Sequence, residues 1–346
     1  MKALRRFAKE PRAARLEQVP LPTLRPGQVL LRVHCCGVCG SDLHAYLNHD
    51  GYESVLAQVT FGHEWVGTVM ETAPQVNDWK IGDRATMVAI QGCLADDCLL
   101  CLNGDTQLCP QRRVQGLHLD GGMAEYVVID QRFLVPLPES LDLRSAALTE
   151  PLSVADHCVV NCSSIRPGDQ VVVSGPGIIG MLCALVARDR GANVAVSGTR
   201  ADVPIRLAIA RRIGFATFIV GPEEPVLGDQ VRKQFGREAD VLIEASGAPA
   251  ALISAANAVT FKGQITVVGI YGTDVGLNMT QLLRKQIDIR TSYGSALPSY
   301  ERSLQMLAAG KIPFESLIQT YPLTDGIRAF EDAENQAVMK PMLLCD

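Results

Sequence analysis

Four cysteines in the first third of the chain have a spacing that suits a metal ion. They form the pattern C-x4-C-x2-C-x7-C, at Cys93, Cys98, Cys101 and Cys109. Four thiolates on one loop complete the tetrahedral coordination of a structural zinc ion and leave no position open for a substrate. The alternative is a set of free surface thiols, which are prone to oxidation. The spacing favours structural zinc, which would hold a lobe together without taking part in the chemistry.

A second set of potential metal ligands is dispersed along the chain. Cys39 stands in GVCGSDLH, His63 and Glu64 stand in FGHEWVG, and Glu150 stands in LTEPLSV. A thiolate, an imidazole and a carboxylate give three zinc ligands and leave a fourth position for water or substrate, which is the composition of a catalytic site. Spacing alone leaves open the alternative that these side chains are simply buried in a core.

A glycine-rich turn follows an apolar strand and opens a helix. Its residues are Gly175, Pro176, Gly177, Ile178, Ile179 and Gly180. In such a turn the first glycine permits the tight bend, the second lets the backbone approach a pyrophosphate, and the third lets the helix pack on the strand. The helix N-terminus offers N–H groups to the phosphates. A turn without a ligand is the alternative, but the strand–turn–helix context favours a dinucleotide.

The end of the next strand bears on which dinucleotide is bound. NAD-binding domains carry an acid there for the ribose hydroxyls. Here the strand ends at Ser197, and Gly198 stands at the place of the acid, followed by Thr199 and Arg200. A small residue beside an arginine leaves space and charge for a 2′-phosphate, which favours NADP(H). Alternatively, Arg200 is a solvated surface charge and Asp202 binds the ribose of NAD(H).

Two kinds of element must position these groups. The first 140 or so residues contain short strand patterns separated by turns such as PGQ, NGD and DGG. Beyond Gln170 apolar strands alternate with helices, which predicts a parallel sheet covered on both faces. The strands are expected at 171–174, 193–197, 216–220, 240–246 and 264–270, with a helix after the second strand that extends through Leu207. Further cofactor contacts are expected at Ser246, Val268 and Gly269.

Composition limits the classes of function. The 346 residues suffice for two domains, and a net charge of −5 is spread without long blocks of one sign. Neither nucleic acid nor a membrane is therefore expected as a partner. The N-terminus lacks the apolar run of a signal peptide, and no stretch reaches the roughly 18 apolar residues of a membrane helix. We expect a cytoplasmic protein, in which the eleven cysteines are metal ligands or core residues rather than disulfides.

Several segments resemble, in order, the motifs of the zinc-containing medium-chain alcohol dehydrogenases, closest in pattern to the sorbitol and threonine dehydrogenase branch. They are GVCGSDLH, GHEWVGTVMETAPQV, the four-cysteine lobe, DGGMAEYVVI, TEPLSVADH and GPGIIG. The resemblance covers essentially the whole chain. It implies an α/β protein with a GroES-like, mainly-β catalytic domain over 1–152 and 293–346. A Rossmann domain with a doubly wound parallel sheet is implied over 153–292, and the last 50 residues are expected to be an irregular mixture that packs onto the first domain.

The resemblance also assigns roles at the dispersed metal site. It implies that Cys39 and His63 bind the catalytic zinc, with Glu64 as a direct or exchanging ligand. Glu150 falls where the polyol branch has a glutamate that reaches the metal directly or through its water. Asp42 would orient a ligand imidazole, as such ligands usually require.

The same resemblance implies a reaction. Ser41 matches the hydroxyl that hydrogen-bonds the alcohol, and His44 matches the surface end of the proton relay. Zinc would lower the pKa of the alcohol, and a hydride would pass between NAD(P) and a secondary alcohol or ketone of a polyol, sugar or related hydroxy compound. A 3-hydroxy amino acid dehydrogenase is an alternative, as is a non-catalytic nucleotide-binding relative. The family forms dimers or tetramers, so a homo-dimer or homo-tetramer is expected.

The sequence departs from the family pattern in the cysteine lobe and in the segment before GHE. The first two cysteines of the lobe are separated by four residues where the family usually has two, and the proline usually seen before GHE is missing. The segment before GHE normally lines the substrate pocket. Its polar residues Tyr46, His49, Tyr52 and Glu53 could contact hydroxyls or an amine, or they could simply cap an exposed loop.

Overall fold

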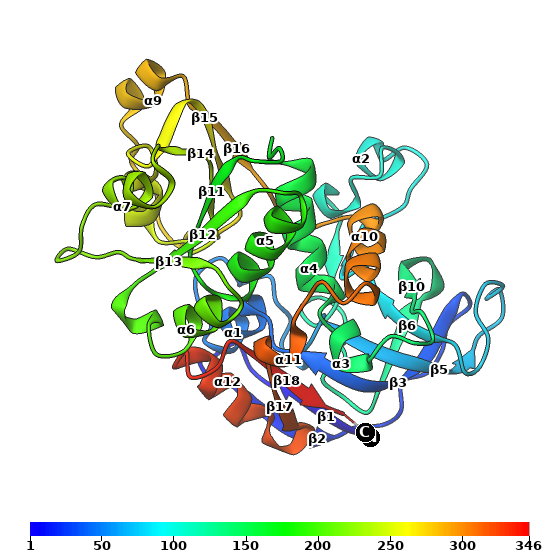
Figure 1. Cartoon of the computed structure of the whole chain (residues 1–346). Helices are drawn as coiled ribbons and strands as arrows, with labels where there is room; N and C mark the ends of the chain where they lie inside the picture. The colour runs from blue at the N-terminus through cyan, green and yellow to red at the C-terminus, as the bar shows by residue number, and fades with distance from the viewer. Residues whose placement is uncertain (346) are drawn as a thin grey trace. The chain divides into compact units, whose positions relative to one another are not determined.

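The computed structural model describes residues 1–345, which separate into two compact units (Figure 1). Unit 1 comprises Met1–Ser153 and the segment from Ser295 onward, and unit 2 comprises Val154–Gly294. The predicted domain boundaries, after residues 152 and 292, fall within a residue or two of these divisions.

Unit 1 is built on three sheets that are antiparallel apart from one parallel pair. Their strand orders are β2-β1-β4, β7-β8 and β10-β6-β5-β3-β18-β17, with β9 also paired to β3. Strand β3 is central to the largest sheet of unit 1, because it pairs with β5, β9 and β18. The strands are β1 (Lys2–Arg6), β2 (Ala14–Gln18), β3 (Gln28–Gly37), β4 (Val59–Thr60), β5 (Trp65–Thr72), β6 (Arg84–Met87), β7 (Ile90–Gln91), β8 (Arg113–Val114), β9 (Tyr126–Asp130), β10 (Leu134–Pro136), β17 (Ile318–Pro322) and β18 (Lys340–Leu344).

Short helices connect these strands. They are α1 (Gly40–Tyr46), α2 (Leu99–Leu102), α3 (Leu143–Ala146), α4 (Thr149–Asp156), α10 (Leu297–Ala308), α11 (Phe314–Leu317) and α12 (Gly326–Glu334), with 3₁₀ helices η1 (Thr106–Leu108), η2 (Gln131–Phe133) and η5 (Leu323–Asp325). Helix α1 packs near α12, where the ring of Phe330 stacks on Tyr46 at a centroid distance of 4.9 Å and meets Phe61 edge-on at 5.3 Å. Tyr46 is therefore a core residue and does not cap an exposed loop.

The prediction that the last 50 residues form an irregular mixture is wrong. This segment forms α10, α11, α12 and the parallel pair β17–β18. Helix α10 begins with a proline in its first turn, a position that proline favours, and it buries Tyr300, Leu304 and Leu307 at helical spacing. Strand β18 pairs antiparallel with β3, so the segment does pack onto the first part of the chain, as expected.

Unit 2 contains one sheet of six parallel strands. Their order is β13-β12-β11-β14-β15-β16, in which the connections reverse direction beside β11. This order defines the doubly wound dinucleotide-binding fold and confirms the predicted fold class. The strands are β11 (Gln170–Ser174), β12 (Asn193–Gly198), β13 (Ala216–Ile219), β14 (Ala239–Glu244), β15 (Val259–Val267) and β16 (Asp288–Thr291).

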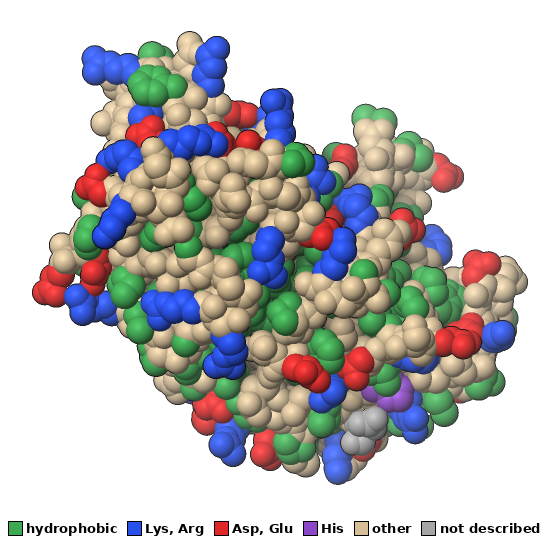
Figure 2. Space-filling view, viewed as in Figure 1, with side chains coloured by type: hydrophobic (Ala, Val, Ile, Leu, Met, Phe, Trp, Pro, Cys, Tyr) green, Lys and Arg blue, Asp and Glu red, His purple; other side chains and the backbone are tan. Residues whose placement is uncertain are grey.

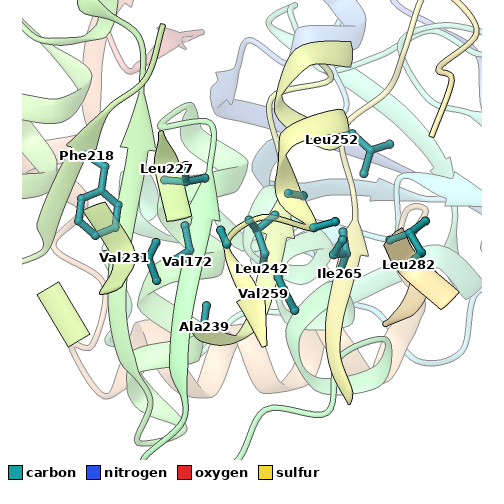
Figure 3. Packing of buried hydrophobic residues seen from close by; sticks show 14 residues of the cluster. Val172, Phe218, Leu227, Val231, Ala239, Leu242, Leu252, Val259, Ile265 and Leu282 are labelled. Atoms are coloured by element: carbon teal, nitrogen blue, oxygen red, sulfur yellow. The ribbon is translucent and has the colours of Figure 1, made fainter. Parts of the chain in front are cut away.

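Helices cover both faces of this sheet. They are the π-helix η3 (His157–Asn161), α5 (Ile178–Asp189), the 3₁₀ helix η4 (Arg200–Asp202), α6 (Arg206–Arg212), α7 (Leu227–Phe235), α8 (Pro249–Ala255) and α9 (Met279–Lys285). Figure 3 shows one apolar layer, in which Val172, Leu242 and Ile265 of the strands pack with residues of α7, α8 and α9. Helices α5 and α6 pack on β11, β12 and β13.

The helix predicted to run through Leu207 after β12 is displaced along the chain. A 3₁₀ turn at η4 comes first, closed by the Asp202 carboxylate on the N–H and hydroxyl of Thr199, and α6 begins only at Arg206. The helical backbone breaks at Ile205, which has a φ of −123° and a ψ of −71°, and Pro204 has no N–H group with which to continue the preceding turn.

The surface carries no dominant charge of one sign on the face seen in Figure 2, where acidic and basic side chains are interspersed. Among the described residues, no helix combines the length and apolarity that crossing a bilayer requires. None of the eleven cysteines is in a disulfide bond.

Candidate active site

The structure brings the four cysteines of the lobe together. Cys93 follows β7, Cys98 precedes α2, Cys101 lies in α2, and Cys109 follows η1. Their sulfur atoms all lie within 4.8 Å of one another. The unusual spacing is absorbed locally, because Leu94 adopts a positive φ of 53° and the N–H of Cys98 closes a turn onto the carbonyl of Ala95 at 3.1 Å.

The sulfur geometry of this lobe fits zinc. The Sγ atoms of Cys93 and Cys101 lie 3.9 Å apart, as do those of Cys98 and Cys109. Four sulfur atoms around zinc, each about 2.3 Å away, would be separated by roughly 3.8 Å. A hydrogen bond from the backbone N–H of Cys93 lowers the pKa of Cys109 to about 7, while burial raises the pKa of Cys101 to about 12. A bound cation would hold the whole set as thiolates.

The dispersed ligands Cys39, His63 and Glu64 also converge. Cys39 precedes α1, and His63 and Glu64 immediately precede β5, which pairs with β3. One ligand atom from each residue lies within 4.8 Å of the other two. Burial, followed by the charge of Glu64, raises the pKa of Cys39 to about 12. The thiolate is therefore favoured at neutral pH only if a cation sits beside it, and a soft–borderline donor set of this kind suits zinc.

His63 is oriented by its neighbours. Its Nδ1 lies 3.5 Å from a carboxylate oxygen of the fully buried Asp42, and its Nε2 lies 3.2 Å from the hydroxyl of Ser41. Asp42 itself is fixed by the backbone N–H groups of Cys39 at 3.1 Å and Gly62 at 3.3 Å. Nε2 therefore faces Ser41, and the buried Nδ1 faces the Asp42 carboxylate without making a hydrogen bond in this structure.

Lys340 is a residue of the site that the sequence reasoning missed. Its ammonium is fully buried, pairs with the carboxylate of Glu64 and donates to the carbonyl of Val38 at 2.8 Å. Desolvation alone would lower its pKa, but the negative charges of Glu64 and Cys39 raise it. Gly37 leaves the room that the Glu64 carboxylate occupies, because a Cβ there would overlap it. The available signal was a lysine inside the apolar run VMKPMLL.

Glu150 lies nearby but outside the converged set. It lies in the first turn of α4, and it is buried. Burial is the largest cause that raises its pKa to about 8; His63 lowers the pKa, and Glu64 and Cys39 raise it. Its carboxylate is not among the donor atoms that lie within 4.8 Å of one another. Direct ligation by Glu150 therefore stays a prediction.

The glycine turn of unit 2 has the geometry that a dinucleotide requires. Gly175 has a φ of +100°, and a Cβ there would lie 2.6 Å from the backbone nitrogen of Ser246. A Cβ on Gly177 would meet nothing within 4 Å, so this position is open to a ligand. A Cβ on Gly180 would overlap the carbonyl oxygen of Gly175, so the helix packs directly on the turn. Ile178 and Ile179 form the first residues of α5.

Two carboxylates, those of Asp202 and Glu224, lie near the residues that follow β12, where Arg200 was predicted to contact the cofactor. Ser197 is buried, and a Cβ on Gly198 would lie 3.0 Å from the carboxylate of Asp202. Asp202 is occupied by the Thr199 hydrogen bonds and by Arg206 at 3.4 Å. The Arg200 side chain is 72% exposed, and its Nε lies 2.6 Å from the carboxylate of Glu224.

Glu244 is a second residue that the sequence reasoning missed. This fully buried carboxylate ends β14, accepts the backbone N–H of Ser246 at 2.8 Å, and also binds the hydroxyl of Tyr271. Its backbone carbonyl accepts the N–H groups of Val268 at 2.9 Å and Gly269 at 3.0 Å. It thus ties together the two predicted cofactor-contact segments. The signal was an acid at the end of the apolar strand VLIE.

Comparisons with known proteins agree with this architecture. Residues 25–139 match the alcohol dehydrogenase GroES-like domain, and residues 179–309 match the zinc-binding dehydrogenase family. Sorbitol dehydrogenase of Halalkalibacterium halodurans is 33% identical over 95% of this chain and 94% of its own length. The structure of 2R,3R-butanediol dehydrogenase from Bacillus subtilis matches with a TM-score of 0.90 and 27% identity, covering 100% of this chain and 99% of that one. A zinc-binding dehydrogenase from Sinorhizobium meliloti bound to NADP matches with a TM-score of 0.88 and 27% identity, covering 99% and 98%.

The chain therefore belongs to the zinc-containing medium-chain alcohol dehydrogenase family. It is a zinc-dependent, nicotinamide-linked oxidoreductase that acts on alcohols, as the resemblance in its motifs predicted.

Proposed function

We propose that this enzyme transfers a hydride between NADP(H) and a secondary alcohol or ketone of a polyol, sugar or related hydroxy compound. The observation that carries the proposal is the convergence of Cys39, His63 and Glu64 beside the hydroxyl of Ser41. Relatives named for sorbitol and butanediol support a polyol-type substrate. The 3-hydroxy amino acid alternative is less well supported: the threonine 3-dehydrogenases match at 29% identity, against 33% for the sorbitol dehydrogenase of Halalkalibacterium halodurans.

In this proposal Cys39, His63 and Glu64 hold the catalytic zinc, with Glu150 reaching it directly or through water. Cys93, Cys98, Cys101 and Cys109 hold a structural zinc. A zinc ion in the first set supplies Lewis-acid charge, which eases deprotonation of an alcohol and polarises a carbonyl. Asp42 keeps the ring of His63 in one orientation, and Lys340 balances the charge of Glu64.

The chain's own residues handle the proton. Ser41 and His44 are three residues apart in α1, so their side chains lie on the same helix face about one turn apart. The Ser41 hydroxyl accepts the substrate proton as it donates its own, and His44 receives the proton at the half-buried end of the helix. The intact donor set argues against a non-catalytic nucleotide-binding relative.

The cofactor binds, in this proposal, at the glycine turn and at the carboxyl ends of β12, β14 and β15. NADP(H) is favoured over NAD(H) because Asp202 already uses its carboxylate for Thr199 and Arg206, while Arg200 is exposed and able to turn toward a 2′-phosphate.

Arg200→Ala is expected to raise the KM for NADP about 10- to 100-fold, the value of one charge-assisted hydrogen bond, while changing the KM for NAD less than about twofold. Steady-state kinetics with both cofactors checks this. Glu224→Gln is the matched variant, because it frees Arg200 from its partner and should lower the KM for NADP. An equal effect of Arg200→Ala on both cofactors would contradict the 2′-phosphate assignment.

Two glycine variants separate folding from cofactor binding. Gly180→Ala is expected to lower the free energy of unfolding by about 1–3 kcal/mol, since its methyl group must displace the carbonyl of Gly175. Gly177→Ala should leave thermal unfolding unchanged, because its methyl group meets no protein atom, yet weaken dinucleotide binding at least about tenfold. Calorimetry of unfolding and of nucleotide binding tests both. Undiminished binding by Gly177→Ala would place the pyrophosphate elsewhere.

We further propose a cytoplasmic homo-dimer or homo-tetramer. Free thiols in both cysteine sets suit a reducing compartment. Strand β16 is an exposed edge of the unit 2 sheet, and α9, which precedes it in the chain, exposes the apolar side chains of Met279 and Leu283. An open edge of this kind favours pairing with a second copy.

The test of the proposed function follows nicotinamide absorbance with zinc-loaded enzyme. Polyols, sugars, secondary alcohols and 3-hydroxy amino acids are each offered with NAD and with NADP. Turnover of a polyol, sugar or other secondary alcohol supports the proposal, and turnover confined to 3-hydroxy amino acids selects the alternative. If no substrate changes the nicotinamide absorbance, in protein shown to bind zinc and dinucleotide, the proposed function is contradicted.

A further inference from the structure

Two histidines at the end of α1 form a close pair. The Nδ1 atoms of His44 and His49 lie 2.8 Å apart, and their ring centroids lie 5.1 Å apart. His44 is half-buried and His49 is exposed. At this distance one Nδ1 donates its hydrogen to the lone pair of the other, so the two rings share one hydrogen bond.

Several contacts hold His44 and His49 in this arrangement. The backbone N–H of His49 donates to the carbonyl of His44 at 3.0 Å, and the ring of Tyr52 stacks on His44 at a centroid distance of 5.3 Å. The fully buried guanidinium of Arg6 donates to the side chain of Asn48 at 2.5 Å and to the carbonyl of Val55 at 3.3 Å. A buried arginine that holds both ends of the loop keeps His49 over α1, which an exposed loop with no role does not require.

Charge around the pair favours a single shared proton. Burial, and then the neighbouring charge of His49, lower the pKa of His44. The other ionisable groups nearby are engaged elsewhere or point to solvent. Asp42 faces His63, Glu53 accepts the N–H of Gly51, Glu331 and Glu334 of α12 lie toward Tyr46 and Arg12, and Asp50 is exposed beside His49. No carboxylate in these contacts is placed to hold His44 as a cation, so a proton that arrives there must move on.

We propose that His49 is a second imidazole of the proton relay and carries the proton from His44 to solvent. This inference rests on the proposed role of His44 in the reaction. The direction follows from burial, because the pair runs from a half-buried ring to an exposed one.

The step balances in protons and charge. In alcohol oxidation, the proton released from the substrate enters His44 at Nε2. The Nδ1 proton of His44 then crosses the 2.8 Å hydrogen bond to Nδ1 of His49, and the Nε2 proton of His49 leaves to water. One proton enters and one leaves, and both rings end neutral in the opposite tautomer. Exchange of ring protons with water restores the starting tautomers, and the reverse sequence supplies a proton during ketone reduction.

The experiment compares His49→Asn, His44→Asn and the control His34→Asn in the zinc- and cofactor-loaded enzyme. His34 is the matched control because it is also a hydrogen-bonded histidine of unit 1, with the hydroxyl of Thr68 at 2.8 Å, but it lies in β3, outside α1 and the loop that carries His49. His49→Gln replaces His49→Asn if the latter fails to fold by circular dichroism. The readouts are the pH profile of kcat in dilute buffer, rescue by free imidazole, and the imidazole resonances of ¹⁵N-histidine-labelled protein.

The proposal expects kcat of His49→Asn to fall about tenfold below neutral pH and to recover with added imidazole. The resonances should show the pKa of His44 rising, because the cationic neighbour is lost, and the rising limb of kcat should move to higher pH. His34→Asn should match the parent. If His44→Asn slows the reaction while His49→Asn keeps the parent profile, the inference about His49 fails and the proposed role of His44 stands. If neither variant slows the reaction, both fail.

Discussion

Cys39→Ser is expected to abolish turnover while leaving dinucleotide binding intact. A serine hydroxyl keeps the volume of the thiol but does not ionise as a soft ligand, so the donor set beside Ser41 loses one of its three members. Loss of Lewis-acid stabilisation worth several kcal/mol corresponds to a fall in kcat/KM of roughly 10³-fold or more. The glycine turn is untouched, so the Kd for NADP should change by less than about twofold.

The measurements for Cys39→Ser are kcat/KM, the zinc content per chain, and the nucleotide Kd by calorimetry. Zinc content should fall by one ion per chain. Cys162→Ser is the matched control, because Cys162 is a partly buried cysteine outside both donor sets and should keep full activity and full zinc content. Turnover that survives in Cys39→Ser would show that the catalytic metal assignment is wrong.

Cys98→Ser or Cys109→Ser is expected to unfold the four-cysteine lobe without destroying the chemistry. The zinc of such sites contributes folding energy directly, so loss of one thiolate should cost about 3 kcal/mol or more and lower Tm by roughly 6–12 °C. The site should also lose zinc as the pH falls, because metal binding requires deprotonated thiols and protons compete for them. At low temperature the remaining site should still turn over, since all its members lie outside the lobe.

Zinc content, thermal unfolding and limited proteolysis check this expectation. Cleavage should appear in the segment 93–109 of the cysteine variants. Leu99→Ser is the control within the same lobe, because Leu99 of α2 is 74% exposed and contributes no ligand. An unchanged zinc content in Cys98→Ser and Cys109→Ser would contradict the structural zinc site.

The features that could be predicted from the sequence are those whose physics is local. Each glycine of the turn at 175–180 has a role that depends on its neighbours in the chain, and the four cysteines lie on one short lobe. The glycine turn and the cysteine lobe could therefore both be recognised as patterns in the sequence. The parallel sheet was visible for the same reason, since apolar strands alternated with helices in unit 2.

The features that were missed depend on pairings across long stretches of chain. Lys340 reaches Glu64 only because β18 pairs with β3 beside β5, and no local pattern specifies that register. Arg6 holds the loop of His49 in the same way. The helix displaced to Arg206 reflects a competition in which the capped turn at η4 and the non-helical backbone of Ile205 override the apolar periodicity.

The most direct test of the account measures zinc content and the rate of nicotinamide reduction in the same sample while metal is removed and returned. We predict one zinc ion for each donor set. Chelation should empty the set of Cys39, His63 and Glu64, the rate should fall in proportion, and added zinc should restore it. A rate that persists in protein containing no zinc would contradict the claim that these three residues form a catalytic metal site.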